Sequence, residues 1–213
     1  MSQVTDADLE HIKGLNNIEE LYLNHTNVTD VGLQHLRDLT NLRALRLSHN
    51  QITGIGLKSL VELSGHLNIA STNITDDGLE HLEGLTNLRS LKLSHTPITD
   101  AGLEQLKELT GLSYLELNYT QITDAGLEHL KRLPDLQRLG LTDTKITDAG
   151  LEHLNEIINL KYLNLTNTQV TDVGLGHLNQ LNKLKQIYVS DNRRVTEYGV
   201  YVIRDALPHC IVY

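Results

Sequence analysis

Histidine is the residue type in this chain whose number and spacing most suggest chemistry. The chain has 213 residues and 11 histidines. Six of these occupy the same column of a sequence repeat: His11, His35, His81, His129, His153 and His177. Imidazole binds zinc, but all ligands must then lie about 2.0–2.1 Å from one ion. Equivalent positions on packed helices lie about 10 Å apart, so we expect solvated or half-buried histidines and no metal site.

Two further motifs suggest chemistry, and neither has the spacing that the chemistry needs. Residues 54–59, GIGLKS, resemble the end of a phosphate-binding loop but lack the upstream glycine of GxxxxGK(S/T). His209 and Cys210 are adjacent, and neighbours in a strand point to opposite faces, so they are a poor base and nucleophile pair. We predict no catalytic residue and no cofactor, and therefore a non-enzymatic protein.

Composition narrows the classes of partner. Lys and Arg total 18 against 27 Asp and Glu, which gives a net charge of −9. Because nucleic acids and anionic membranes are bound by clustered basic residues, we expect neither as a partner. One cysteine cannot form an internal disulfide, so the fold does not depend on an oxidising compartment. The sequence shows no signal peptide and no apolar run as long as a membrane span; the compartment is left open, with the cytoplasm slightly favoured.

The helices and strands that position these side chains are predicted from a sequence repeat that fills the chain. Its consensus is (I/V)TDxGLxxLxxLxxLxxLxLxx(T/N)x, usually over 24 residues, and the third unit is two residues short. Units begin at residues 4, 28, 52, 74, 98, 122, 146 and 170. The segment at about 194–213 departs from the consensus, and we interpret it as a C-terminal cap. We predict one domain over residues 1–213.

One unit, residues 28–51, predicts the local structure. Leu33, Leu36 and Leu39 form an apolar stripe typical of a short helix. Thr29 or Asp30 stands where the helix N-cap belongs, and the later alternation around Leu45 and Leu47 indicates a short strand. A single unit cannot bury its leucines, but stacked copies can.

Two columns of the repeat predict structural roles. The residue after each strand is Thr26, Asn50, Thr72, Thr96, Thr120, Thr144, Thr168 or Asn192. These side chains both donate and accept hydrogen bonds, so they can pair backbone groups that the turn leaves facing inward. A glycine column opens each helix: Gly32, Gly56, Gly78, Gly102, Gly126, Gly150, Gly174 and Gly199. We expect close backbone approach or a positive φ there; Asp8 in the first unit, which lacks a preceding coil, favours close approach.

The strand motif LxxLxLxx(T/N), followed by (I/V)TDxGLxxL, resembles the leucine-rich repeat family. It is most similar to the ribonuclease-inhibitor-like and cysteine-containing (F-box-associated) class and its bacterial relatives. The resemblance implies an α/β fold: a right-handed solenoid, or horseshoe, with a parallel sheet on its concave face and helices on its convex face. This chain has Thr or Asn where the cysteine-containing class often has Cys, and it shows no F-box-like segment, so no ubiquitin-ligase role is carried over.

The strand positions that the repeat leaves variable should line the concave face. Tyr and Arg are common at binding hot spots, and we predict these partner-binding residues: Tyr22, Arg46, Lys92, Tyr114, Glu116, Tyr119, Arg138, Tyr162, Asn164 and Tyr188. Gly140 should leave a gap flanked by Tyr114, Arg138, Tyr162 and Asn164, where a partner side chain could enter. Tyr is also common on exposed strands for structural reasons alone.

We therefore predict a binding module that recognises a protein or peptide on its concave sheet. The alternative is a structural or consensus-like repeat scaffold, or a fragment of a larger repeat protein, without a dedicated partner site. The uniformity of the units favours that alternative. We expect a monomer, although an open first strand at about 20–24 would allow end-to-end self-association.

Overall fold

The computed structural model describes residues 4–213 and contains one nine-stranded parallel sheet in which the strands follow chain order. The strands are β1 (Glu20–Tyr22), β2 (Ala44–Arg46), β3 (His66–Asn68), β4 (Ser90–Lys92), β5 (Tyr114–Glu116), β6 (Arg138–Gly140), β7 (Tyr162–Asn164), β8 (Gln186–Tyr188) and β9 (Ile211–Val212). Equivalent residues of successive repeats lie side by side, as Leu91, Leu115 and Leu139 do. Residues 1–3 of the predicted domain lie outside the described residues.

A short helix precedes each strand. The α-helices are α1 (Asp6–Leu9), α2 (Asp30–Leu33), α3 (Asp76–Leu79), α4 (Asp100–Glu104), α5 (Asp124–Leu130), α6 (Asp148–His153), α7 (Asp172–His177) and α8 (Glu197–Ala206). Many continue as 3₁₀ turns: η1 (Glu10–Ile12), η2 (Gln34–Leu36), η4 (Glu80–Leu82), η5 (Gln105–Glu108), η6 (Leu154–Glu156) and η7 (Leu178–Gln180). The two-residue-short unit has only a 3₁₀ helix, η3 (Ile55–Ser59). The predicted N-cap is Thr: Thr29 has extended backbone and its hydroxyl accepts from Val31 N–H.

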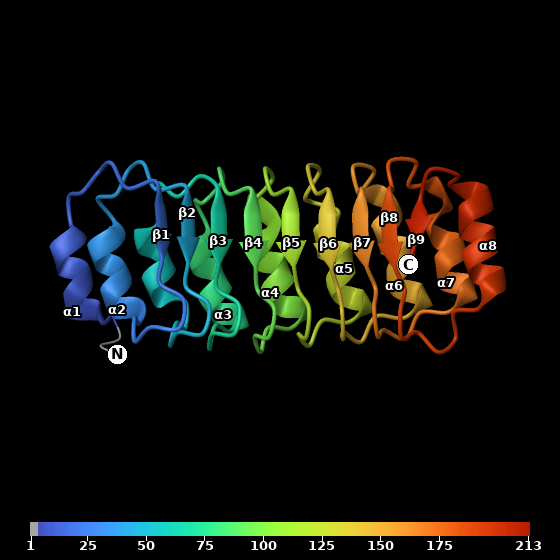
Figure 1. The fold of residues 1–213 in the computed structure, drawn as a ribbon, viewed down its shortest axis with the longest axis horizontal. Coiled ribbons are helices and arrows are strands. Elements are labelled where there is room, and N and C mark those ends of the chain that lie inside the picture. The colour runs from blue at the N-terminus through green and yellow to red at the C-terminus, as the bar shows by residue number, and fades with distance from the viewer. Residues whose placement is uncertain (1–3) are drawn as a thin grey trace.

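The helices and the sheet form two layers, with the sheet toward the viewer in Figure 1 and the helices behind it. The row of helices extends beyond the row of strands at both ends, where α1 and α8 lie outside β1 and β9. The helical row is therefore the outer, longer side of the curve and the sheet is the inner, concave side. The predicted α/β leucine-rich-repeat solenoid is confirmed.

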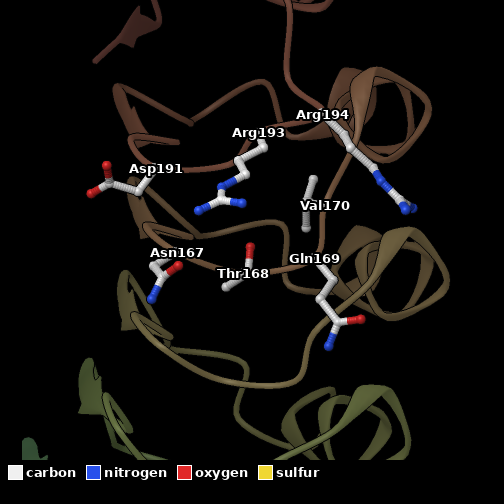
Figure 2. Close-up of a pocket in the computed structure, with 7 residues that line it drawn as sticks. All are labelled: Asn167, Thr168, Gln169, Val170, Asp191, Arg193 and Arg194. Atoms are coloured by element: carbon white, nitrogen blue, oxygen red, sulfur yellow. The ribbon is translucent and has the colours of Figure 1, made fainter.

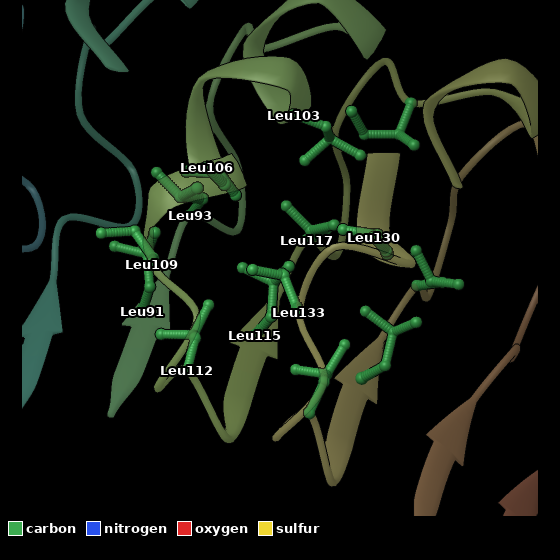
Figure 3. Close-up of a cluster of buried hydrophobic side chains, with 14 of the residues drawn as sticks. Leu91, Leu93, Leu103, Leu106, Leu109, Leu112, Leu115, Leu117, Leu130 and Leu133 are labelled. Atoms are coloured by element: carbon green, nitrogen blue, oxygen red, sulfur yellow. The ribbon is translucent and has the colours of Figure 1, made fainter. Parts of the chain in front are cut away.

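Leucine fills the space between the layers. In Figure 3, Leu91 and Leu115 point back from β4 and β5 toward Leu103, Leu106 and neighbouring leucines of the helical segments. Nearly every repeat leucine is at most a few per cent exposed, and they join into one continuous cluster. Burying one such side chain stabilises the fold by about 1.5–3 kcal/mol, so each coil depends on the coils at its two sides.

The Thr/Asn column performs the predicted structural role. The Thr96 and Thr120 hydroxyls donate to the carbonyls of Leu93 and Leu117, at 2.5 and 2.6 Å. Asn50 donates its shortest bonds, of 2.6 and 2.9 Å, to the carbonyls of Leu23 in the preceding coil and Leu47 in its own. These bonds satisfy carbonyls that the turn would leave buried without a partner.

A second ladder of hydrogen bonds, which the repeat pattern did not reveal, joins the starts of successive helices. In every unit from the first to the eighth except the third, the Asp accepts from both the backbone N–H and the hydroxyl of Thr in the next unit, as Asp100 does from Thr123 at 2.7 and 2.6 Å. We call this set the Asp–Thr ladder. Its acceptors are Asp6, Asp30, Asp76, Asp100, Asp124, Asp148 and Asp172, and its donors are Thr29, Thr53, Thr99, Thr123, Thr147, Thr171 and Thr196.

The glycine column exists because of this ladder. A Cβ added to Gly174 would lie 2.2 Å from the Asp148 Oδ1 and 3.1 Å from the Asp148 Cα. Most glycines of the column meet the ladder Asp of the preceding coil in the same way. None of them has a positive φ, so close approach, and not backbone conformation, is the reason for glycine.

The short third unit interrupts the ladder. Gly54 replaces the ladder Asp, so Thr75 loses the acceptor that its counterparts have. Asp30 instead accepts from Thr53, Gly54 and Gly56. Burial alone would raise the pKa of Asp30, but these backbone and hydroxyl donors outweigh it and lower the pKa. The shorter unit is therefore joined by the ladder to the preceding unit, through Asp30 and Thr53, but not to the following unit.

Each end of the solenoid is closed by its own side chains. At the first unit, the Asp8 carboxylate accepts from both the backbone N–H and the hydroxyl of Thr5, which replaces the missing ladder Asp. At the other end, α8 and β9 cover the last coil, and Arg204 donates to the Val212 carbonyl on the edge strand. The N-terminal closure was not anticipated from the sequence, because only the ladder explains why Asp8 stands in the glycine column.

Two glycines in α7 give a matched test of this packing. We expect Gly174→Ala to lower the free energy of unfolding by about 1–3 kcal/mol, because its methyl group collides with Asp148. Gly176→Ala should raise it by about 0.5–1 kcal/mol, because no atom lies within 4 Å of the new methyl group and alanine favours the helix. Urea unfolding measures both, and equal effects of the two substitutions would contradict the packing explanation.

Candidate functional site

The ten predicted partner-binding residues all lie on the concave side of the sheet or beside it. In each strand the middle residue, such as Leu115 or Leu139, points into the core, and the residues on either side of it point outward. Nine of the ten occupy these outward positions, and Tyr119 lies in the turn just after β5. Whether a partner contacts them stays a prediction.

A hollow of about 220 Å³ lies on this surface over β5 to β8. Register pairs Gly140 with Glu116 on one side and Asn164 on the other. The hollow is lined by Tyr114, Glu116, Asn118, Arg138, Leu139, Gly140, Tyr162, Leu163, Asn164, Gln186 and Tyr188. Because glycine has no side chain, the sheet backbone forms the floor here, and the neighbouring side chains form the walls. We call this the concave hollow.

Aromatic rings fix the walls of the concave hollow. The Arg138 guanidinium carbon lies 4.1 Å from the centre of the Tyr162 ring, a cation–π contact worth about 0.5–1 kcal/mol when exposed. Tyr188 stacks on Tyr213 with ring centroids 4.7 Å apart, so the C-terminal residue braces the far wall. These contacts restrict the rotamers of the large side chains that surround the concave hollow.

The opposite wall is a network of charged and polar side chains whose charges and hydrogen bonds are paired within the network. The Glu116 carboxylate accepts from Lys92 at 3.0 Å, from the Tyr114 hydroxyl at 2.6 Å and from the Ser94 hydroxyl at 2.9 Å. Partial burial alone would raise the pKa of Glu116, but the hydrogen bonds and the Lys92 charge outweigh it, so the pKa lies below its ordinary value. The pKa values of Tyr114 and Lys92 are raised, which keeps both protonated at neutral pH.

The first two strands carry a smaller cluster of the same kind. The Arg46 guanidinium carbon lies 4.4 Å from the centre of the Tyr22 ring, and the Tyr22 hydroxyl donates to Glu20. Tyr22 is 53% exposed. This cluster lies on β1 and β2, several strands from the concave hollow, so the predicted residues form two groups and not one continuous site.

One column beside the strands was not recognised from the sequence as conformationally special. Its residues all have φ between 52° and 63°: His25, His49, Ser71, His95, Tyr119, Asp143, Asn167 and Asp191. Left-handed backbone is uncommon outside glycine, and the residues that adopt it are most often Asn, Asp and His. The recurrence of these residue types in one column was the feature of the sequence that could have predicted this conformation. The turn presents the side chains as a row, in which His25 stacks on His49 and His95 on Tyr119, with centroids 4.1 and 4.2 Å apart.

A second hollow, of about 310 Å³, opens at the edge of the solenoid between the strand ends and the helix starts. Figure 2 shows its lining: Asn167, Thr168, Gln169, Val170, Asp191, Arg193 and Arg194. Arg193 points toward the turn that holds Asn167 and Thr168, whereas Arg194 points away toward the helices. The opening coincides with Arg194, which lengthens the repeat at this point by one residue, so that Val195 follows Val170 by 25 residues. It mixes both signs of charge and lacks aromatic walls, so we assign it no binding role.

The residues that suggested chemistry are not brought together. The histidine column lies on the convex side, exposed or half-buried, and across residues 4–213 no group of three or more His, Cys, Asp or Glu could hold a metal ion. Cys210 is buried, and burial raises the pKa of its thiol to about 11, which makes it a poor nucleophile at neutral pH. Of the helices in the described part of the chain, none has the length and apolar character that a membrane crossing requires.

Sequence and structure comparisons agree with this architecture. A sequence profile described as leucine rich repeat matches residues 2–64, 86–146 and 134–193, and a second profile with that description matches residues 66–82. No curated protein matches the chain.

Several solved structures are similar to the chain. The structure of internalin C2 from Listeria monocytogenes is 27% identical with a TM-score of 0.68, over 99% of this chain and 84% of that one. An internalin, inlF, from the same organism is 21% identical with a TM-score of 0.53, over 99% and 77%. A repeat protein of Leptospira interrogans is 23% identical with a TM-score of 0.66, over 97% and 62%. The last two likenesses concern the fold alone.

The Glu116 network predicts a pH-dependent contribution to stability. Because folding lowers the pKa of Glu116, its contribution is present above the ordinary value of 4.5 and is lost as the pH falls through the folded-state pKa. We expect Glu116→Gln to cost up to about 1 kcal/mol at pH 7, since Lys92 is partly exposed, and much less at pH 3. Urea unfolding of the wild-type chain and the variant, at pH 7 and at pH 3, measures this loss of stability. Glu104→Gln, on the exposed side of α4, is the control, and a cost at Glu116 that does not change with pH would contradict the network.

Proposed function

The chain belongs to the leucine-rich repeat family, and from this premise we propose that it is a non-enzymatic module that binds a protein or peptide on its concave sheet. Repeat domains of this family are a common scaffold for protein interactions, and solenoids of this type use extended concave surfaces for binding. We also propose that residues 4–213 act as one repeat domain of the ribonuclease-inhibitor-like class. A single sheet, a continuous core and an outer layer of helices support this classification.

One observation carries the functional proposal: large side chains with hot-spot chemistry gather around the concave hollow, and the repeat does not need them there. The core is filled by Leu and Ile, so Tyr114, Arg138 and Tyr162 are not required for stacking the coils. Tyr and Arg, together with Trp, are the residues that are enriched at binding hot spots. Parallel strands lie about 4.8 Å apart, so the sheet spans roughly 35–40 Å, which is enough for a standard interface or an extended peptide.

The alternative is a structural scaffold without a partner site, and the regularity of the two ladders favours it. Sequence variation among close relatives separates the two possibilities. A binding module should vary most at the outward strand positions, because partners differ. A scaffold should vary evenly over the concave and convex faces.

We propose further that the chain is a monomer. Asp8 occupies the space in which the ladder Asp of a second copy would have to lie, and Arg204 covers part of the opposite edge strand. Sedimentation equilibrium at high concentration should give the mass of one chain, 23.9 kDa. A mass that grows with concentration would mean that the ends associate in spite of these side chains.

Substitutions on the two faces test the binding proposal. Affinity capture with the whole chain identifies a partner, and calorimetric titration then compares variants. We expect Tyr114→Ala and Arg138→Ala each to weaken binding by about 2 kcal/mol, or roughly 30-fold in Kd, because they remove walls of the concave hollow.

His153→Ala, on the convex helix α6, is the control and should leave the affinity unchanged. Thermal unfolding of each variant checks that the fold is retained. If the convex substitution weakens binding as much as the concave ones do, the partner does not use the concave sheet.

A further inference from the structure

We propose that the concave hollow binds a carboxylate, the side chain of an Asp or Glu residue in the protein partner. This inference rests on the proposed function and names the chemistry of its central contact. Arg138, Asn118 and Asn164 line the hollow with hydrogen-bond donors that have no acceptor among residues 4–213, and Arg138 adds a positive charge.

Arg138 supplies the charge. Its guanidinium lies on the face of the Tyr162 ring and forms no ion pair or hydrogen bond with any residue from 4 to 213. Stacking leaves the edge of the guanidinium, which carries the N–H groups, free to donate. The one carboxylate in the lining, on Glu116, is already engaged by Lys92 and by two hydroxyl groups. Within the lining of the hollow, Arg138 is therefore the positive charge that remains available to a partner.

Asn118 and Asn164 supply two more donors, and their orientation is fixed. The Asn118 Oδ1 accepts from the backbone N–H of Thr142 at 2.9 Å, and the Asn164 Oδ1 accepts from the backbone N–H of Thr166 at 2.9 Å. A backbone N–H can bond only to the oxygen of a side-chain amide, so each Nδ2 must point the other way. Neither Nδ2 has an acceptor among residues 4–213, and neither is a buried, unsatisfied atom.

Gly140 leaves the space in which the Asn118 amide lies, at the floor of the hollow. A Cβ at this position would lie 2.8 Å from the Asn118 Oδ1, so any other residue would displace the amide. The opening of about 220 Å³ is several times the roughly 30 Å³ that one liquid water occupies. It can therefore admit a side-chain carboxylate together with the methylene groups that carry it.

The balance of charge selects the ligand. A carboxylate carries one negative charge, which a single Arg neutralises, and it offers several lone pairs to Arg and amide donors. A phosphorylated side chain carries about −1.5 to −2 charges, more than Arg138 alone can balance. The net charge of −9 on the whole chain does not prevent binding, because charges beyond about 8 Å are screened at physiological salt.

Nuclear magnetic resonance of the whole ¹⁵N-labelled chain tests the inference without knowledge of the partner. The probes are two acetylated and amidated pentapeptides of Gly and Ser, one with a central Glu and the other with a central Gln. We expect the Glu peptide to shift the Nδ2 signals of Asn118 and Asn164 and the Nε signal of Arg138. The Gln peptide should bind at least about tenfold more weakly, because it lacks the charge-assisted hydrogen bond.

Two arginine variants form a matched pair, since both side chains lie on a tyrosine ring on the concave face but only Arg138 lines the hollow. Arg138→Gln should remove the preference for Glu over Gln. Arg46→Gln should preserve it. A preference that survives Arg138→Gln, or that is lost equally in both variants, overturns the inference.

The remaining outcomes separate this inference from the proposed function. Equal shifts at the hollow with both peptides would overturn the carboxylate preference, yet they would support peptide binding on the concave sheet. An absence of shifts at the hollow with either peptide also overturns the inference. In that case the partner titration with concave and convex variants still decides the proposed function by itself.

Discussion

The hydrogen bonds between the Asp of one coil and the Thr of the next are the constraint on which the rest of the structure depends. A leucine core alone is non-directional and would tolerate sliding between coils. The Asp148 carboxylate, in contrast, accepts from both the N–H and the hydroxyl of Thr171 at 2.7 and 2.6 Å, which fixes one register. Bonds to a charged acceptor are roughly twice as strong as neutral ones. Repetition of this contact turns a hydrophobic stack into an ordered solenoid.

The same contact explains features that otherwise look unrelated. Glycine recurs at the helix start because the carboxylate of the preceding coil occupies the space of a side chain, as at Gly174. The first unit can tolerate Asp8 in that column because no ladder carboxylate competes with it, and Asp8 then bonds Thr5 instead. The two-residue-short unit shows that the ladder can be interrupted once, at Gly54, when the leucine core remains continuous on both sides.

Much of the fold could be predicted from the sequence because its determinants are periodic. The Leu stripe, the Thr/Asn column and the strand positions all follow from spacing alone, and the structure has them where the repeat predicts them. The role of Asp30 could not be predicted in this way. The sequence left Thr29 and Asp30 as alternative caps; the structure has Thr29 as the cap, and the Asp30 side chain reaches the next coil. Whether an Asp side chain accepts a hydrogen bond from its own helix or from the next coil depends on its rotamer, which one sequence does not specify.

The candidate site shows the same limit of prediction, because one sequence does not specify which side chains pair. Position in the repeat predicts that Lys92, Glu116 and Arg138 lie on the concave face, but it does not say which charges pair. In the structure Lys92 and Glu116 lie in register on adjacent strands and neutralise each other. Arg138 faces Tyr114 and Tyr162 and has no acid opposite it. Because Arg138 is exposed, its guanidinium is available to an acceptor on a partner, and this charge, which is unpaired among residues 4–213, is the basis of the proposed carboxylate contact.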